Sequence, residues 1–293
     1  MSSNNYLSSL SDDLNYAAPL KRFPTRSHSG AMILGNSLTT AENVTLVHAP
    51  LSYFAIDRLT SKGPRQNADV GAPHDASRSL QRDVGTSIPG NSIAAGSWWC
   101  AQGGWPSKKL RTTTEIFHVL QGFGCLTDLD GKRNFFGPSD TVILPKGWSG
   151  RWDVAEPIHK IWFVHDHEKI EEDTTQTIRA RIIHYHDLTA SHTMTPLKAR
   201  NDATHNTSPQ STSKSIYDVG PTEVGYWTCT PGSFSVTKQS TECFHVLEGV
   251  FFLTNAADGT SQKCAAGDTI LLPRGWSGDF DILETVKKVW IEV

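Results

Sequence analysis

The sequence predicts an all-β protein that carries two copies of one barrel domain. An internal repeat is the first observation behind this prediction: residues 115–122 (EIFHVLQG) recur as residues 242–249 (ECFHVLEG), with six identities in eight. Residues 140–162 align without a gap on residues 268–290, with twelve identities in twenty-three, and the copies lie 127 to 129 residues apart. A repeat of that length is typical of a duplicated domain rather than of a solenoid or a propeller blade.

Short runs of β-branched and aromatic residues are the second observation. TVILP and KIWFV in the first copy correspond to TILLP and KKVWIEV in the second, and turn signals stand at Asp130-Gly131 and Asp258-Gly259. Such runs, separated by tight turns, predict several short strands in each copy. Many short strands within roughly 80 residues favour a sandwich or a closed barrel.

The composition of the remaining segments sets the expected domain boundaries. Residues 1–40 are rich in Ser, Asn and Thr without a sustained period, which predicts an N-terminal arm. The first barrel is expected over residues 41–168, with its core at 90–165. A charged and polar connector is expected over residues 169–215, and the second barrel over residues 216–293.

Charge and cysteine content narrow the classes of partner and location. The net charge is −3 and no basic stripe stands out, so we expect neither nucleic acid nor a membrane as a partner. The five cysteines show no CxxC motif and no paired spacing. Free thiols of this kind favour a reducing compartment, and we expect a cytoplasmic location.

The repeated segments resemble the cupin superfamily. TEIFHVLQG followed by DTVILPKGWSGRWDV, and TECFHVLEG followed by GDTILLPRGWSGDFDI, are most similar to small cupins of the ethanolamine-utilisation and ureidoglycine-aminohydrolase type. The resemblance covers roughly residues 90–165 and 218–293, and it implies two tandem jelly-roll (double-stranded β-helix) barrels. It also implies that the barrels oppose their outer sheet faces about a pseudo-twofold axis, and a homodimer is a candidate assembly.

The resemblance also shows which metal ligands are replaced. The first cupin motif places His-x-His and then Glu at three ligand positions. In this sequence those positions hold Lys109, Arg111 and Glu115 in the first copy, and Val236, Lys238 and Glu242 in the second. The histidine of the second motif is replaced by Gly150 and Gly278. Each copy therefore keeps one of the four usual ligands, the Glu.

This replacement predicts a pocket that works without a metal. Lysine and arginine bring a positive charge, which repels a divalent ion, and glycine supplies no ligand. We therefore expect no metal and no other cofactor. Lys109, Arg111 and Lys238 are instead expected to bind a small anionic or polar molecule, because such cations recognise carboxylates and phosphates. The first barrel is the favoured site, since it has the fuller polar set.

Glu115 and Glu242 are the candidate catalytic residues, with two interpretations open. The resemblance puts both carboxylates inside their barrels, where each must be paired or must shift its pKa. Each acts as a general acid or base, or each forms a structural ion pair, with Lys109, Arg111 or Lys160 as the partners of Glu115. Lys160 and Lys288 could instead pair with the glutamates four residues earlier, Glu156 and Glu284.

Two further pairs of residues recur in both copies. Strand alternation puts His118 and His245 on the faces opposite the glutamates, near the contact between the barrels. Trp148 and Trp276 follow the Pro-x-Gly corner at the expected barrel mouth. Each indole either stacks on a ligand or covers the end of its barrel.

Three classes of function are compatible with these residues. The favoured class is an enzyme that performs metal-free acid–base chemistry (isomerase, lyase, cyclase or hydrolase type) on a small anionic or polar metabolite. The alternative is a non-catalytic ligand-binding module, and the second alternative is a metalloenzyme with non-standard ligands. A glutamate with a shifted pKa beside a reachable ligand would favour the enzyme over the binding module.

Overall fold

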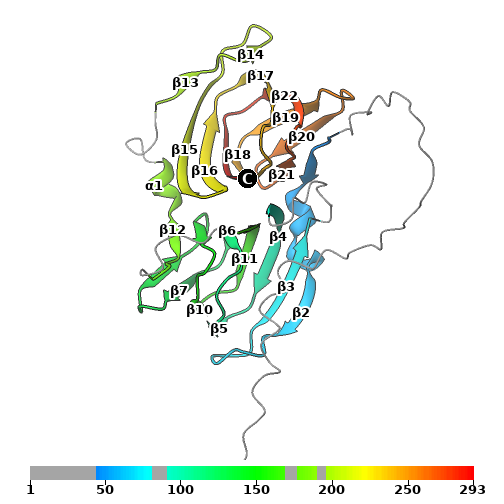
Figure 1. Cartoon of the computed structure of the whole chain (residues 1–293). Coiled ribbons are helices and arrows are strands. Elements are labelled where there is room, and N and C mark those ends of the chain that lie inside the picture. The colour runs from blue at the N-terminus through cyan, green and yellow to red at the C-terminus, as the bar shows by residue number, and fades with distance from the viewer. Residues whose placement is uncertain (1–43, 81–90, 169–176, 190–195) are drawn as a thin grey trace, which may run out of the picture. The chain divides into compact units, whose positions relative to one another are not determined.

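The protein folds into two barrels, each built of two sheets (Figure 1). The computed structural model describes residues 44–80, 91–168, 177–189 and 196–293. Within these, the segment from Val44 to Val293 forms one compact unit. The expected N-terminal arm, residues 1–40, lies outside the described residues. The prediction of two tandem all-β jelly-roll barrels is confirmed.

A large and a small sheet form the first barrel. Its strands are β2 (Thr60–Pro64), β3 (His74–Ser79), β4 (Asn91–Cys100), β5 (Gly103–Ser107), β6 (Thr114–Gln121), β7 (Gly124–Asp128), β8 (Arg133–Phe136), β9 (Thr141–Leu144), β10 (Gly150–Val154), β11 (Ile158–His167) and β12 (Arg181–Ile183). The large sheet has the order β12-β9-β6-β11-β4-β3-β2, and the small sheet has the order β5-β10-β7-β8.

The second barrel repeats this architecture. Its strands are β1 (Val47–Ala49), β13 (Lys198–Ala199), β14 (Ala203–Thr204), β15 (Gln210–Val219), β16 (Thr222–Cys229), β17 (Gly232–Thr237), β18 (Glu242–Glu248), β19 (Val250–Asn255), β20 (Ser261–Ala265), β21 (Thr269–Leu272), β22 (Ser277–Ile282) and β23 (Val286–Glu292). The sheets have the orders β1-β21-β18-β23-β16-β15-β13 and β14-β17-β22-β19-β20.

Helical structure is confined to short segments. These are η2 (Leu51–Phe54), η3 (Ile56–Arg58) and α1 (Tyr185–Thr189) in the described residues. None of the helices in this part of the chain is long and apolar enough to span a membrane.

Two strands belong to a different sheet from the one that composition suggests. β1 precedes the first repeat in the sequence but pairs with β21 of the second barrel, with Val47 opposite Leu271. β12 lies in the expected connector but pairs with β9 of the first barrel, with Arg181 opposite Ile143. Both strands cover an edge that would otherwise expose unpaired backbone groups. The connector therefore contributes to the barrels and does not merely join them.

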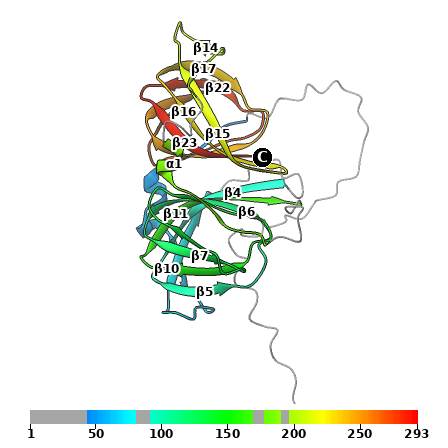
Figure 2. The ribbon, with the colours of Figure 1, turned by 90° about the vertical axis from the view of Figure 1, so that its left-hand side faces the viewer.

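β6 is buried on both of its faces. Phe117 packs around the barrel lumen, where it lies 3.9 Å from the ammonium of Lys160. On the opposite face, Ile116 joins a hydrophobic cluster that both barrels share, and the ring of His118 lies 5.5 Å from the ring of His245. The expectation that both histidines lie outside the lumens is therefore confirmed. Figure 2 shows β6, β11 and β4 in this sheet, in which β11 pairs with both of the other strands.

Candidate functional site

The lumen of the first barrel contains an ion cluster around Glu115. This carboxylate projects inward from β6, and Lys160 reaches it from the neighbouring strand β11 with Nζ 2.7 Å from Oε1. Arg111 reaches it from the loop before β6 with its NH2 group 2.7 Å from Oε2. Both carboxylate oxygens of Glu115 are therefore bound by cations. The structure brings Glu115 and Arg111 together, as the sequence predicted.

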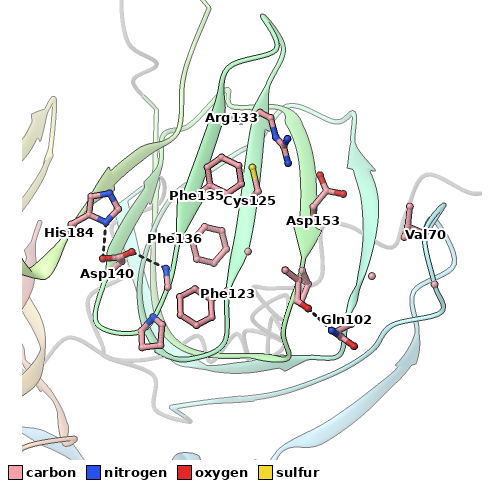
Figure 3. Close-up of a pocket in the computed structure, with 17 residues that line it drawn as sticks. Val70, Gln102, Phe123, Cys125, Arg133, Phe135, Phe136, Asp140, Asp153 and His184 are labelled. Carbon is pink, nitrogen blue, oxygen red and sulfur yellow. Dashed lines mark hydrogen bonds and ion pairs between the residues drawn. The ribbon is translucent and has the colours of Figure 1, made fainter.

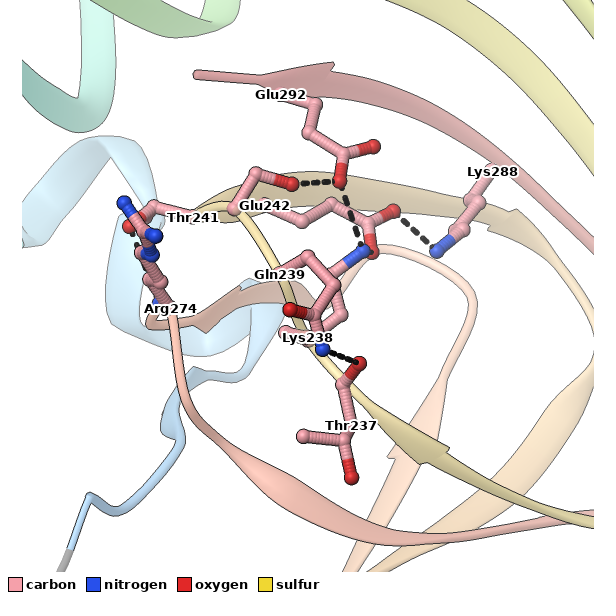
Figure 4. A network of polar contacts seen from close by, with 9 residues as sticks. Thr237, Lys238, Gln239, Thr241, Glu242, Arg274, Lys288 and Glu292 are labelled. Atoms are coloured by element: carbon pink, nitrogen blue, oxygen red, sulfur yellow. Dashed lines mark hydrogen bonds and ion pairs between the residues drawn. The ribbon is translucent and has the colours of Figure 1, made fainter.

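The second barrel contains the corresponding cluster around Glu242 (Figure 4). Lys288 of β23 lies 2.5 Å from Oε1 of Glu242, and Lys238 lies 2.9 Å from Oε2. The ammonium of Lys238 also lies 3.2 Å from a second carboxylate, that of Glu292. In both barrels the retained glutamate is thus held between two cations.

Aromatic rings surround each of these internal ammonium groups. The Nζ of Lys160 lies 3.9 Å from the ring centroid of Phe117, and 4.8 Å from those of Trp98 and Trp152. The Nζ of Lys288 lies 3.9 Å from the ring centroid of Phe244. Ring faces attract a cation, and this attraction is strengthened where water is excluded. Each barrel therefore holds a cation of its own chain beside the retained metal-ligand glutamate.

The electrostatics of the clusters keep both glutamates ionised. Burial alone would raise the pKa of Glu115, but the charges of Lys160 and Arg111 outweigh it and lower that pKa below its usual value. Glu242 behaves in the same way, because burial is outweighed by Lys288 and Lys238. A carboxylate whose pKa is lowered and whose two oxygens are both engaged is a weak proton acceptor. The ion-pair interpretation of both glutamates therefore has the stronger support.

Three of the expected ligand-binding residues lie elsewhere. Lys109 is exposed on the loop before β6, because its neighbour Arg111 takes the place beside the carboxylate. Trp148 is fully buried, and its Nε1 donates a hydrogen bond of 2.7 Å to Asp128. Trp276 is also fully buried, and its Nε1 donates to Asn255 at 2.6 Å. Neither indole presents a face to a ligand in this conformation.

The two internal lysines form ion pairs with glutamates of a neighbouring strand. Lys160 and Lys288 pair with Glu115 and Glu242 rather than with the glutamates four residues earlier in the sequence. Glu156 and Glu284 precede β11 and β23 and lie outside any strand. The paired strands β6 and β18 instead bring Glu115 and Glu242 within reach of the two lysines.

The residues present do not fit the metal that cupins commonly bind. A Cβ at Gly150 would lie 2.2 Å from the carbonyl oxygen of Thr127 and 2.8 Å from the Trp148 indole. A Cβ at Gly278 would lie 2.6 Å from the Trp276 indole. The indole thus occupies the space of the missing histidine in each barrel. Among the described residues, no group of three or more His, Cys, Asp or Glu side chains is arranged to hold a metal ion.

We therefore expect that restoring one histidine fails to restore a metal site. Gly278→His should lower the free energy of unfolding by about 3 kcal/mol or more, because the side chain must displace a fully buried indole and a strand backbone. Gly259→Ala is the control, since a Cβ there meets no atom within 4 Å and only the backbone φ of +68° opposes it. Urea denaturation and elemental analysis measure the two effects. A stable Gly278→His protein with one bound transition metal would contradict this interpretation.

One difference between the barrels is the size of two aromatic rings. In the first barrel Trp105 and Trp152 are opposite each other on β5 and β10 and stack with centroids 5.9 Å apart. In the second barrel Phe234 and Phe280 occupy the corresponding strand positions and stack at 5.0 Å. A cavity of about 190 Å³ lies beside these smaller rings in the second lumen.

Charged and aromatic side chains line this cavity. The lining residues include Arg200, Trp227, Phe234, Val236, Lys238, Glu242, Phe280, Lys288, Trp290 and Glu292. Arg200 stacks on Phe234 with its guanidinium carbon 3.7 Å from the ring centroid, and it pairs with Asp202. Trp227 is only partly buried, whereas its counterpart Trp98 in the first barrel is 2% exposed.

Sequence reasoning missed two of these polar residues. Arg200 lies in the expected connector and outside any cupin motif, so no spacing pointed to it. Glu292 lies on the last strand, directly opposite Glu242. The repeat alignment could have pointed to Glu292, because this acidic residue corresponds to an apolar residue, Val164, of the first copy. The sequence favoured the first barrel as the site, and that choice stays a prediction.

A second, larger groove lies on the first barrel (Figure 3). It has a volume of about 900 Å³ and is lined by Phe123, Phe135 and Phe136, with the ion pair of His184 and Asp140 at one side. Phe123 and Phe135 are 50% and 61% exposed. None of the ion-cluster residues of either lumen lines this groove.

Comparison with known proteins agrees with this architecture. A protein of unknown function from Pseudomonas syringae superposes with a TM-score of 0.58 at 18% identity, covering 74% of this chain and 86% of its own. The Ylba protein of E. coli superposes with a TM-score of 0.55 at 11% identity, covering 88% and 95%. A variant of salicylate 1,2-dioxygenase from Pseudoaminobacter salicylatoxidans gives 0.60 at 11% identity, covering 86% and 83%. At these identities the likeness concerns the fold alone.

The family follows from the sequence match. No protein of curated function matches the chain in sequence. The EutQ-like cupin domain matches it twice, at residues 89–162 and 218–290, which together make up half of its length. The chain therefore belongs to the EutQ-like cupin family and carries that family's domain in duplicate.

Proposed function

We propose that the protein binds a small polar molecule in the lumen of its second barrel, and that the first barrel is a filled copy with a structural role. The observation that carries this proposal is the replacement of two stacked indoles, Trp105 and Trp152, by the phenyl rings of Phe234 and Phe280 beside a cavity of about 190 Å³. Both lumens hold a glutamate between two cations, and the cavity beside the smaller rings favours the second lumen as the site.

The lining of the cavity indicates the kind of molecule. An apolar cavity of about 150 Å³ accommodates benzene, so the second lumen suits a ligand of comparable or slightly larger size. Trp227, Phe234 and Phe280 supply flat apolar walls, whereas Lys238 and Arg200 supply cations. A compact ligand with a planar apolar body and one anionic group fits this combination.

Binding is better supported than catalysis at the retained glutamate. Glu242 is 8% exposed and is bound by two lysines, which leaves it little capacity to accept a proton. Acid–base chemistry is the second candidate function, because Glu292 also lines the cavity and its side chain is 30% exposed. For this second function Glu292, rather than Glu242, is the proposed proton-transfer group.

A location and an assembly accompany this function. We propose a cytoplasmic location, which is supported by five cysteines that are all free and buried. We also retain the homodimer as a proposal. Neither depends on which barrel binds the ligand.

Exchanging the aromatic residues between the barrels tests the proposed site. Phe234→Trp combined with Phe280→Trp should fill the second lumen and weaken binding of benzoate, used as a probe, by at least about tenfold. Overpacking of this kind lowers the free energy of unfolding by about 1–3 kcal/mol, so folding is checked by circular dichroism. Isothermal titration calorimetry gives the affinities.

The opposite exchange in the first barrel is the matched control. Trp105→Phe combined with Trp152→Phe should leave the affinity of the second-barrel site within about twofold of the wild type, because the two lumens are separate. Unchanged benzoate affinity in the filled second-barrel variant would show that the ligand binds elsewhere and would overturn the proposal.

A further inference from the structure

The cavity of the second barrel is lined by a carboxylate that has no counterpart in the first barrel. On β6 and β11 of the first barrel, Glu115 is directly opposite Val164. On β18 and β23 of the second barrel, Glu242 is directly opposite Glu292. The same strand position thus carries an apolar side chain in the first barrel and an acidic one in the second barrel, where the cavity lies.

The two carboxylates of the second barrel are held with different strength. Glu242 is 8% exposed and contacts Lys288 at 2.5 Å and Lys238 at 2.9 Å. Glu292 is 30% exposed and contacts Lys238 at 3.2 Å, and the same oxygen, Oε1, accepts a hydrogen bond from Ser240. An ion pair that is longer and nearer solvent is the weaker one. The contact between Lys238 and Glu292 is therefore the one that an incoming anion can exchange most readily.

The charge of the cavity supports such an exchange. Its lining contains Lys238 and Lys288 with Glu242 and Glu292, so these four charges cancel, and Arg200 is balanced by Asp202 outside the lining. When Glu292 turns away, the lumen keeps one uncompensated positive charge. A buried positive charge without a partner is unfavourable, and one ligand carboxylate restores neutrality.

We propose that Glu292 is an internal stand-in for the ligand, and that a small monocarboxylate binds by replacing the Glu292 carboxylate on Lys238. This inference rests on the second-barrel site proposed above. It names the ligand class as monocarboxylates with a compact apolar body. It also explains how the charges that line the lumen cancel when no ligand is bound.

Glu292→Gln is the variant that tests this exchange, because it keeps the shape of the side chain and removes its charge. We expect Glu292→Gln to bind benzoate about tenfold more tightly than the wild type, since the ligand no longer displaces a competing carboxylate. Binding of benzamide, which has the same shape without the charge, should be unchanged. Lys238→Met should abolish the tighter binding when it is combined with Glu292→Gln.

Glu248→Gln is the matched control. Glu248 lies on β18, pairs with Lys287 of β23 at 2.9 Å, and does not line the cavity. Its loss should leave benzoate affinity unchanged. Equal or weaker benzoate binding by Glu292→Gln, or an equal gain for benzamide, would overturn the exchange.

The two proposals fail in different ways. If benzoate binds and filling the second lumen weakens it, but Glu292→Gln does not tighten it, the site stands and the exchange is wrong. If benzoate binding survives filling of the lumen, the site itself is wrong. If benzoate binds neither the wild type nor Glu292→Gln, the proposed monocarboxylate class is wrong.

Discussion

Acidification from pH 7 to pH 4.5 is expected to lower the free energy of unfolding by several kcal/mol. Burial lowers the pKa of His118 to about 4, and burial together with the nearby charges of His167 and Lys146 lowers the pKa of His165 to about 4. Burial also holds the pKa of His245 well below its usual value. In the unfolded chain these imidazoles take up protons near pH 6.5, whereas in the folded chain His118 and His165 take them up only near pH 4.

The sign and size of this change in the free energy of unfolding follow from the difference in proton uptake between the two states. Between pH 6.5 and pH 4.5 the unfolded state binds more protons, so stability falls as the pH falls. A group whose pKa drops from about 6.5 to about 4 contributes a loss of roughly 2.5 kcal/mol by pH 4.5. The pKa values of Glu115 and Glu242 are lowered from a usual 4.5, so their ion pairs weaken only below this window.

Replacing the interfacial pair isolates the histidine contribution. His118→Gln combined with His245→Gln removes two titrating groups and keeps a polar side chain beside Thr141 and Thr269, which bond the two imidazoles. Urea denaturation at pH 7 and pH 4.5 should show a clearly smaller loss of stability in this variant than in the wild type. His186→Gln, at a side chain that is 80% exposed, should behave as the wild type. An identical acid response in all three proteins would contradict the assignment.

Glu115→Gln is expected to destabilise the protein by about 3–5 kcal/mol at pH 7, and Glu242→Gln by a similar amount. Glu115→Gln leaves two buried cations without their shared carboxylate, and Glu242→Gln leaves Lys288 without its partner while Lys238 keeps Glu292 at 3.2 Å. An uncompensated buried charge is strongly unfavourable. Adding Lys160→Met to Glu115→Gln should recover part of the loss, because it removes the more deeply buried of the two cations. Thermal and urea denaturation measure these effects.

The control for the ion clusters is the surface pair of Glu248 and Lys287. Glu248 is 47% exposed, so Glu248→Gln should change the free energy of unfolding by less than about 1 kcal/mol. A loss below 1 kcal/mol in Glu115→Gln, with turnover of a substrate abolished, would favour the catalytic interpretation of this residue instead.

The amino-acid sequence by itself determined the fold class and the direction of the key side chains. The recurrence of residues 115–122 at 242–249 identified the duplication, because chance does not repeat such a pattern in register. Strand alternation placed Glu115 inward and His118 outward, since the side-chain period of a strand is two. The Lys, Arg and Gly residues at the metal-ligand positions were also visible in the sequence.

Only the tertiary structure decided which side chains meet and where space remains. Lys160 pairs with Glu115, which lies 45 positions earlier in the sequence and on a neighbouring strand. Arg200 lines the cavity of the second lumen although it belongs to no motif. In the repeat alignment Trp105 and Phe234 are both simply aromatic, and only the packed structure shows a cavity of about 190 Å³ beside Phe234 and Phe280. A cavity is what remains after all side chains have packed, so it depends on the summed volumes of many residues and not on any single position.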